Sequence, residues 1–357
     1  MDNINRRSFI RKSGAAVGAL SLPALLAACG SDASSSPSST TSTGSPKVTT
    51  PKIGLSSTPL ASYVTVMSGP VIGGAKFGLN ATKKDFTVFD SSTTVTQSAL
   101  SGKLGMIGQS TMAQLLLIDK GLPFKIFCPY ILVDDFVIAA RGLTDISQLK
   151  DATFATDSPG GAGTTIADAI LVATNAGFLV SDIKKKIVVE SSGERQSALA
   201  NGDCQATIIH LPQANQIPTS KGKINLIGKL YGQVPDFLKE CYSAKTDWLD
   251  GNLDTAAAVC AGLISNSQAM SKDEAAWTST VKQFVDSPPP AADLKQIFPL
   301  IGQYGFWPVD PDGGLTDARV QFMLDLGHKE GLLKKNLTVD DVVDRRPLQR
   351  AAKLLAG

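Results

Sequence analysis

Two segments of the chain, about one hundred residues apart, follow the same pattern. The segment from Thr87 reads TVFDSSTTVTQSALSGKLGMIG, and the segment from Ile187 reads IVVESSGERQSALANGDCQATIIH. In each, an apolar strand ends in an acidic residue, two serines follow, a helix carries Gln-Ser-Ala-Leu, and a glycine precedes another apolar strand. This repetition predicts an α/β fold with two similarly wound lobes. Chance repetition of a common strand–helix–strand pattern is the alternative.

Short apolar runs alternate with helical patterns from Pro51 onward, and the chain after Trp248 is almost wholly helical. We expect strands at 52–56, 86–90, 104–108, 153–157, 186–190 and 206–210. We expect helices at 60–67, 95–101, 111–119, 164–176, 194–201, 212–220, 253–270, 272–285, 293–301, 316–330 and 347–355.

The turn DSPGGAGTT provides the first candidate binding residues, Ser158, Gly163, Thr164 and Thr165. Its glycines let a ligand approach the backbone, and the N–H groups at the start of the next helix attract anionic or strongly polar atoms. The spacing is not that of a Walker loop, and the loop lacks its lysine. A plain capped helix start is the alternative.

Other strands also end in polar residues, and ligands of open α/β sheets bind at such strand ends. The candidates are Ser57, Thr58, Gln109, Ser110 and His210. Each serine or threonine is individually more often a helix cap, and His210 has an edge position in the sheet as its alternative. The candidate turns contain no arginine, which favours a neutral or singly charged ligand.

Three aromatic residues could form pocket walls: Tyr63, Phe136 and Trp307. A place in the core is their more common role. The pair Asp134-Asp135 could meet a cationic amine, but we expect a solvated acidic pair.

The amino terminus predicts export. The basic stretch NRRSFIRK precedes a mildly apolar stretch, interrupted by Pro23, that is too short to span a bilayer well. The paired Arg6 and Arg7 are typical of the twin-arginine motif, with an ordinary secretory signal as the alternative. Residues 1–28 are thus predicted to be a cleaved signal peptide.

Leu26-Ala27-Ala28-Cys29 resembles the bacterial lipobox, which makes Cys29 the predicted lipid-attachment residue; a chance cysteine is the alternative. The following stretch, GSDASSSPSSTTSTGSP, has no large apolar residue and is typical of a flexible linker, assigned to 29–50. Since one acyl chain anchors only marginally and two anchor firmly, diacylation would hold the protein on the outer face of the cytoplasmic membrane.

Charge and cysteine content limit the remaining possibilities. Four of the 34 basic and one of the 32 acidic residues precede Cys29, which leaves a near-neutral mature chain. This argues against a nucleic-acid partner. The later cysteines Cys128, Cys204, Cys241 and Cys260 show no CxxC or zinc spacing, so no metal is predicted. Buried free thiols are expected, with disulfides as the alternative.

The order of motifs in the second half resembles a known family. The sequence LTDISQLKD leads into a strand; DSPGGAGTT and a helix follow, then NAGF with SDI, and then SALANGDCQATIIHLP. The carboxyl-terminal VDRRPL before a helix fits the same pattern. This order is similar to that of the ABC-importer solute-binding proteins, in the group for nitrate, sulfonate, bicarbonate and thiamine-pyrimidine precursors. The expected aspartate after Gly102-Lys103 is absent, which weakens the placement.

The resemblance implies a periplasmic-binding-protein fold of type II, with two lobes joined by two crossover strands near 135–140 and 240–245. Lobe 1 would comprise 51–134 and 246–357, and lobe 2 would comprise 135–245. It also implies a monomeric, membrane-tethered protein that captures a small polar or anionic molecule for an ABC permease. No cofactor is implied.

Two other functional classes stay open. Some proteins of this fold are enzymes, but the sequence has no recognisable Ser/His/Asp arrangement, no paired carboxylates at telling positions and only two histidines. No catalytic residue is therefore predicted. A sensor that signals to a membrane receptor is the third class.

Overall fold

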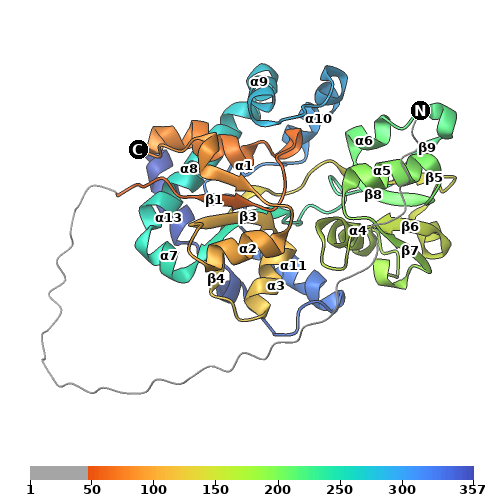
Figure 1. Cartoon of the computed structure of the whole chain (residues 1–357), viewed down its shortest axis with the longest axis horizontal. Helices are drawn as coiled ribbons and strands as arrows, with labels where there is room; N and C mark the ends of the chain where they lie inside the picture. The colour runs from red at the N-terminus through yellow and green to blue at the C-terminus, as the bar shows by residue number, and fades with distance from the viewer. Residues whose placement is uncertain (1–46) are drawn as a thin grey trace, which may run out of the picture. The chain divides into compact units, whose positions relative to one another are not determined.

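The structure is a computed structural model and describes residues 47–357 (Figure 1). The predicted signal peptide, Cys29 and most of the predicted linker lie outside these residues. The described chain forms two five-stranded sheets, each with its own helices. Lobe 1 is the part built on the first sheet, and lobe 2 is the part built on the second.

The first sheet has the strand order β2-β1-β3-β10-β4. Three of its strands are parallel neighbours, and β10 runs antiparallel between β3 and β4. The bounds are β1 (Ile53–Leu55), β2 (Phe86–Val88), β3 (Met106–Ser110), β4 (Phe124–Ile131) and β10 (Glu240–Lys245). All but the edge strand β2 are almost wholly buried, as expected for a sheet covered on both faces.

The second sheet repeats this topology with the order β7-β6-β8-β5-β9. Here β5 is the antiparallel strand, and it lies between β8 and β9. The bounds are β5 (Phe136–Arg141), β6 (Thr153–Thr156), β7 (Lys185–Val188), β8 (Ala206–His210) and β9 (Ile224–Lys229). The two-lobed α/β fold predicted from the repeated segments is therefore confirmed.

The repeated segments themselves adopt equivalent structures. After β2, Phe89 N donates to Leu55 O (2.8 Å), and after β7, Val189 N donates to Thr156 O (2.7 Å). Ser91 and Ser191 then cap α2 (Ser92–Leu100) and α5 (Ser192–Asn201) through their side-chain oxygens. The two segments are thus alike in structure as well as in sequence.

The remaining helices of lobe 1 flank the first sheet and extend beyond it. They are α1 (Thr65–Ser68), α3 (Thr111–Asp119), α7 (Thr246–Gly251), α8 (Leu253–Met270), α9 (Glu274–Phe284), α10 (Ala291–Gln303), α11 (Asp317–Lys329), α12 (Val339–Val342) and α13 (Arg346–Ala356). The other helices of lobe 2 are α4 (Ala162–Ala173) and α6 (Leu211–Asn215). Among residues 47–357, no helix has both the length and the apolar character needed to cross a membrane.

The central helix α8 shows how small residues position the core of lobe 1. Its Ala-rich sequence favours helix, and 13 of its 18 residues are buried. A side chain at Gly73 would place Cβ only 1.9 Å from Gly262 O, so the chain before Leu79 can lie directly against α8 only with glycine there. The helix expected at 60–67 is consequently broken into short turns, including the single turn η1 (Ala61–Tyr63) and α1.

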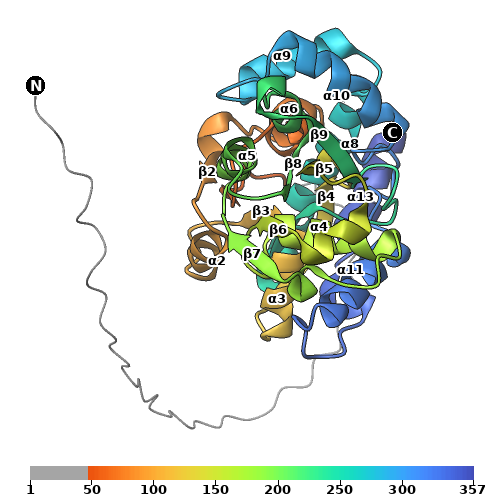
Figure 2. The same cartoon turned by 90° about the vertical axis from the view of Figure 1, so that its right-hand side faces the viewer.

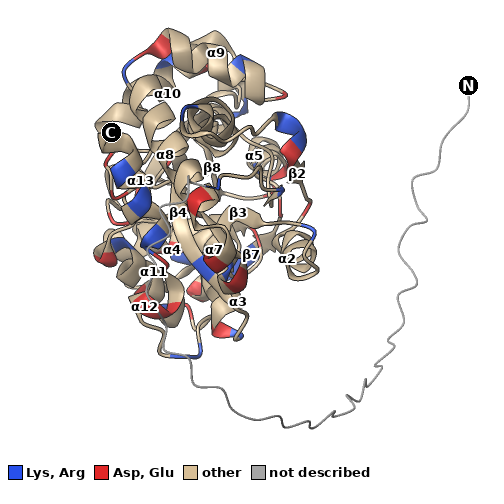
Figure 3. Cartoon of the chain, turned by 90° about the vertical axis from the view of Figure 1, so that its left-hand side faces the viewer, with Lys and Arg blue, Asp and Glu red and all other residues tan. Residues whose placement is uncertain are grey.

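Charged residues on lobe 1 are interspersed rather than segregated. Figure 3 shows basic and acidic segments near each other around α7, α12 and α13. Arg346 pairs with Asp250 (2.7 Å) and Asp344 (2.6 Å).

The two crossovers lie earlier in the chain than expected. The first comprises the four residues between β4 and β5, because 136–140 already belong to the sheet of lobe 2. The second is the segment between β9 and β10, because β10 pairs with β3 and β4. Residues 240–245 therefore belong to lobe 1. The sequence pattern located both strands, but it placed 240–245 in lobe 2 rather than in lobe 1.

The lobes also contact each other away from the crossovers. Asn215 at the end of α6 donates to Gln296 in α10 (2.7 Å), and Gln216 donates to Asp293 in the same helix (3.0 Å). Figures 1 and 2 both show α6 near α10. The helix expected at 212–220 ends early, two residues before the Ile217–Pro218 bond, where the chain turns away.

Candidate functional site

A buried ion pair joins the two crossovers. Lys239 Nζ lies 2.5 Å from Asp134 Oδ2, and the two side chains are 3% and 0% exposed. The backbone supports the same contact, because Lys239 N donates to Leu132 O (2.9 Å). We call this contact the hinge pair. It holds the two crossover segments together at the place where they pass between the lobes.

Glu240 and two aromatic rings complete the environment of Lys239. Its ammonium lies 3.4 Å from Glu240 Oε1 and 4.3 Å from the centre of the Tyr63 ring. Tyr130 donates to Glu240 Oε2 (2.7 Å). Burial alone would lower the pKa of Lys239, but the nearby Asp134 and Glu240 carboxylates outweigh burial and raise that pKa. The charged form of Lys239 is therefore favoured by its neighbours.

A second buried pair lies beside the hinge pair. His210, the last residue of β8, places Nδ1 2.7 Å from Asp135 Oδ1. The imidazole also packs on Phe136, with ring centres 3.9 Å apart. Because Asp135 holds Nδ1 through a proton, Nε2 is the ring nitrogen left for another partner. His210 is one of the residues chosen from the sequence, and it lines the pocket described next.

Asp135 and His210 line a pocket of about 240 Å³, which we call the hinge pocket. Lobe 1 contributes residues from η1 and from the loop that leads into α10, and lobe 2 contributes the end of β8 and α6. The lining residues are Leu60, Ala61, Ser62, Asp135, His210, Pro212, Gln213, Gln216, Ser287, Pro288, Pro289, Pro290 and Ile297. A ligand in this pocket would contact both lobes.

The turn at Ser158–Thr165 uses its donors internally. Asp157 accepts hydrogen bonds from Gly163 N (2.8 Å) and Thr164 N (2.6 Å), and Thr164 Oγ1 also donates to this carboxylate. Ser158 Oγ donates to Glu190. The expectation that the Gly163 and Thr164 amides face a ligand is therefore corrected: the carboxylate of Asp157 takes the place of an anion. Thr165 is 2% exposed.

The remaining predicted positions lie in lobe 1, and none of them lines the hinge pocket. Ser110 caps α3 by accepting from Ala113 N (3.3 Å). Gln109 is wholly buried, and its side-chain amide atoms have no partner among residues 47–357. Ser57 is half-buried and Thr58 is exposed, and the carbonyl of Thr58 accepts from Tyr63 Oη (2.9 Å).

Sequence reasoning named the acidic pair at the hinge but missed its burial. Asp134 and Asp135 were expected to be solvated, but they are 0% and 2% exposed. The residues on either side of them, Val133 and Phe136, are apolar, which was the available signal for burial. Lys239 was not singled out at all, because 104 positions separate it from Asp135 and no local pattern connects them.

All three aromatic residues are buried in the core, and none of them lines the hinge pocket. Tyr63 and Phe136 both lie over the Lys239 ammonium, which attracts ring faces. Trp307 is 1% exposed and belongs to the core, where its indole donates to Ser62 O (2.6 Å). It thereby fixes a residue that lines the hinge pocket.

Three groups at the hinge have the proximity that a metal site requires. Asp134, Asp135 and His210 each offer a ligand atom within 4.8 Å of the others. Lys239 already neutralises Asp134, however, and His210 already bonds Asp135. A divalent cation would have to displace both contacts, so these residues fit a metal poorly.

A second pocket, of about 240 Å³, lies where α4 of lobe 2 meets the end of α11 in lobe 1. Three carboxyl groups line it: Asp157, Asp168 and Glu330. Burial and the neighbouring Asp168 raise the pKa of Glu330 to about 8. Burial raises the pKa of Asp168 to about 6, although a hydrogen bond from Val180 N (2.6 Å) opposes the shift. The pair therefore retains a proton near neutral pH.

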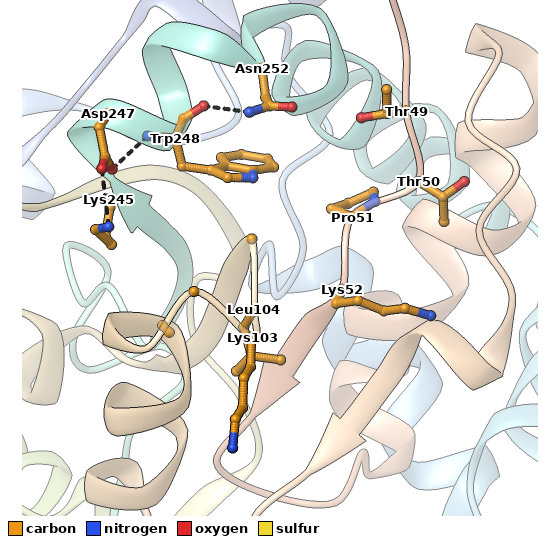
Figure 4. Close-up of a pocket in the computed structure, with 13 residues that line it drawn as sticks. Thr49, Thr50, Pro51, Lys52, Lys103, Leu104, Lys245, Asp247, Trp248 and Asn252 are labelled. Carbon is orange, nitrogen blue, oxygen red and sulfur yellow. Dashed lines mark hydrogen bonds and ion pairs between the residues drawn. The ribbon is translucent and has the colours of Figure 1, made fainter.

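A larger pocket, of about 380 Å³, lies within lobe 1 beside Trp248 (Figure 4). Three lysines line it, but Lys52 pairs with Asp85 (2.7 Å) and Lys245 with Asp247 (3.0 Å). Figure 4 shows Lys52 and Lys103 extending away from the indole. The pocket does not direct its charges to one point and contacts only lobe 1, so it is a weaker candidate than the hinge pocket.

No protein-family model and no curated protein sequence matches the chain. Solved structures, in contrast, do match the chain. The periplasmic nitrate-binding protein NrtA from Synechocystis PCC 6803 is 16% identical, with a TM-score of 0.67 over 87% of this chain and 90% of that one. A sulfonate-binding protein SsuA of a putative ABC transporter from Methylobacillus flagellatus KT is 15% identical, with a TM-score of 0.62 over 87% and 95%.

The CA3427 gene product of Candida albicans, described as having the generic periplasmic binding protein structural fold, is 14% identical. It has a TM-score of 0.59 over 85% of this chain and 94% of that one. The chain thus has the periplasmic-binding-protein fold, and proteins of the group predicted from its motifs are among its structural neighbours.

Proposed function

We propose that the protein is a solute-binding protein that captures a small molecule outside the cytoplasm and delivers it to an ABC permease. The observation that carries this proposal is the hinge pocket, which takes residues from both lobes beside both crossovers. The nitrate-binding and sulfonate-binding neighbours support the general role. They suggest nitrate, a sulfonate, bicarbonate or a pyrimidine precursor as the first solutes to test.

Lobe closure is the mechanism that follows from this arrangement. The lobes are joined by two crossovers and fastened by one buried ion pair, so a rotation at the hinge can open the contact between α6 and α10. A ligand bound to both lobes would favour the closed state by its differential affinity. The closed pair of lobes would then be the form that a permease recognises.

The tether is part of the proposal. The described chain enters lobe 1 beside the start of α8, where Lys47 N donates to Asp254 (3.0 Å) and Thr49 N to Thr255 (2.9 Å). A lipid on Cys29 would therefore hold lobe 1, leaving lobe 2 free to move. Twin-arginine export, diacylation of Cys29 and a monomeric state complete the hypothesis. Incorporation of labelled palmitate that Cys29→Ser abolishes would test the anchor.

The central experiment is a ligand screen on the purified full chain. Nitrate, alkanesulfonates, bicarbonate, pyrimidines and flavins are compared by thermal shift, followed by analysis of each mixture for new products. We expect one class to raise Tm without being converted. Ligand conversion would overturn the binding-protein proposal. If no solute in an expanded library changed the Tm, this result would also count against solute capture.

An enzyme is the second candidate, because one observation favours it. The Asp135–His210 pair faces a pocket, and a histidine fixed by a carboxylate is a common general base. Ser62 lines the same pocket. The product analysis described above separates this candidate from capture.

A further inference from the structure

The buried groups around the hinge pocket carry excess negative charge. Asp134, Asp135 and Glu240 are acidic, whereas only Lys239 and His210 are basic. With all three carboxylates ionised, the sum is one negative charge when His210 is protonated and two when it is neutral; burial raises the pKa of Asp134, and the Lys239 ammonium opposes that shift. In a weakly polar interior a further anion would raise this charge at high cost, whereas a cation would reduce it.

Two polar atoms of the lining are available to a ligand. Asp135 is 2% exposed, and its Oδ1 bonds His210, but its Oδ2 accepts no hydrogen bond from the described residues 47–357. His210 is 7% exposed and uses Nδ1, so Nε2 is free within the same part of the chain. Both residues line the pocket. Oδ2 is reachable from the pocket rather than sealed in the core, so a ligand N–H group could donate to it.

Three consecutive prolines of the lining suit an apolar body. Pro288, Pro289 and Pro290 lie side by side in the lining and have no N–H groups to offer an anion. The helix that follows them, α10, carries Asp293 in its first turn, which offsets the positive end of the helix dipole. No lysine or arginine is among the lining residues.

We propose that the hinge pocket selects a small nitrogen compound without negative charge, which places N–H donors on Asp135 and an apolar face against the prolines. This inference rests on the proposed function and narrows its ligand class. It separates this chain from the anion-binding proteins that share its fold. Benzamidine, benzamide and benzoate are suitable probes, because they have nearly the same planar shape and differ in charge.

The test measures Kd for the three probes, and for nitrate and methanesulfonate, on the full chain by ligand-observed NMR titration. We expect benzamidine to bind roughly tenfold or more tightly than benzoate, with benzamide between them. Asp135→Asn should remove most of this preference. Asp90→Asn makes the same charge change at an exposed position outside the pocket and should leave the preference unchanged.

The outcomes distinguish this inference from the function on which it rests. Tighter binding of benzoate, nitrate or methanesulfonate would overturn the ligand class while leaving solute capture intact. Equal affinities, or no saturable signal from any probe, would also contradict the inference. Conversion of a solute to product would instead contradict capture. The comparison of benzamidine, benzamide and benzoate needs only the unmodified chain. The inference can therefore still be tested if Asp135→Asn fails to fold.

Discussion

Lys239 and Asp134 form a 2.5 Å ion pair between the two crossovers, and neither side chain is more than 3% exposed. Each residue is adjacent to a second charged group, Glu240 and Asp135 respectively, so the contact is the centre of a small buried network. A pair placed here constrains the hinge itself rather than either lobe. Its removal should therefore affect both stability and the distribution between open and closed forms.

We expect Lys239→Met to lower the free energy of unfolding by about 3–5 kcal/mol, because it leaves Asp134 buried without its counter-charge. Urea denaturation measures the loss. Lys245→Met is the matched control, since Lys245 pairs with Asp247 at the surface and should lose less than about 1 kcal/mol. Equal losses in the two variants would show that the hinge pair has no special role.

His210→Ala should weaken binding of the tightest probe by about 10- to 100-fold, since Nε2 can no longer meet the ligand and Asp135 loses its donor. Calorimetric titration measures this change, and circular dichroism checks the fold. His328→Ala, in α11 and outside the hinge pocket, is the control. A ligand that binds His210→Ala as tightly as the unmodified protein must lie elsewhere.

Stability should depend on pH through Glu330. Burial raises its pKa from 4.5 to about 8, so the folded state keeps a proton that the unfolded state releases. The free energy of unfolding therefore falls as pH rises from about 4.5 to about 8. At pH 8, Glu330→Gln should be more stable than the unmodified protein by about 1–2 kcal/mol, and at pH 4 the two should be similar.

Thermal denaturation between pH 4 and pH 9 measures this effect. Glu194→Gln, at an exposed position of α5, should leave the pH profile unchanged. If Glu330→Gln had the same pH profile as the unmodified protein, this result would contradict the assignment of the pH dependence to Glu330.

Asp157→Ala distinguishes the turn at Ser158–Thr165 from the hinge pocket as the binding place. Loss of the carboxylate leaves the Gly163 and Thr164 amides without acceptors, at a cost of about 1–2 kcal/mol. Ligand affinity should stay the same if the hinge pocket is the site. Direct substitution of Gly163 is less informative, because a Cβ there would lie 3.1 Å from both Arg195 and Asp157. A large loss of affinity in Asp157→Ala would restore the turn as a ligand contact.

The four described cysteines should be unreactive in the folded protein. Cys128, Cys204, Cys241 and Cys260 are all buried free thiols, so no disulfide forms among them in this structure. Burial raises the pKa of Cys204 to about 11 and that of Cys128 well above its usual value, which keeps both protonated. In the Cys29→Ser chain, Ellman's reagent should react with four thiols only after denaturation, and reducing agent should not lower Tm. Fast labelling of the native protein would contradict this burial.

Local patterns predicted the repeated unit well. The segments from Thr87 and Ile187 form equivalent edge strands, serine caps and helices, because each feature depends on residues a few positions apart. The expected helices at 111–119 and 253–270 coincide with α3 and α8. Both have uninterrupted helical sequences.

The site was harder to predict because its contacts are between distant residues. His210 was chosen for its position at a strand end, but its partner Asp135 is 75 residues away. The hinge pair likewise joins separate crossovers. The internal use of the Gly163 and Thr164 amides had a local signal, since Asp157 stands directly before the turn. The glycine-rich spacing alone did not show that this carboxylate would return to cap the helix.

The place of β10 between β3 and β4 determines the order in which the chain can fold. Lobe 2 is continuous from β5 to β9, so its sheet can form as soon as Lys229 has been synthesised. In lobe 1 the two neighbours of β10 must wait for residues 240–245, by which time all of lobe 2 exists. Lobe 1 therefore begins first and finishes last, and its unpaired strand edges are exposed to misassembly throughout synthesis of the other lobe.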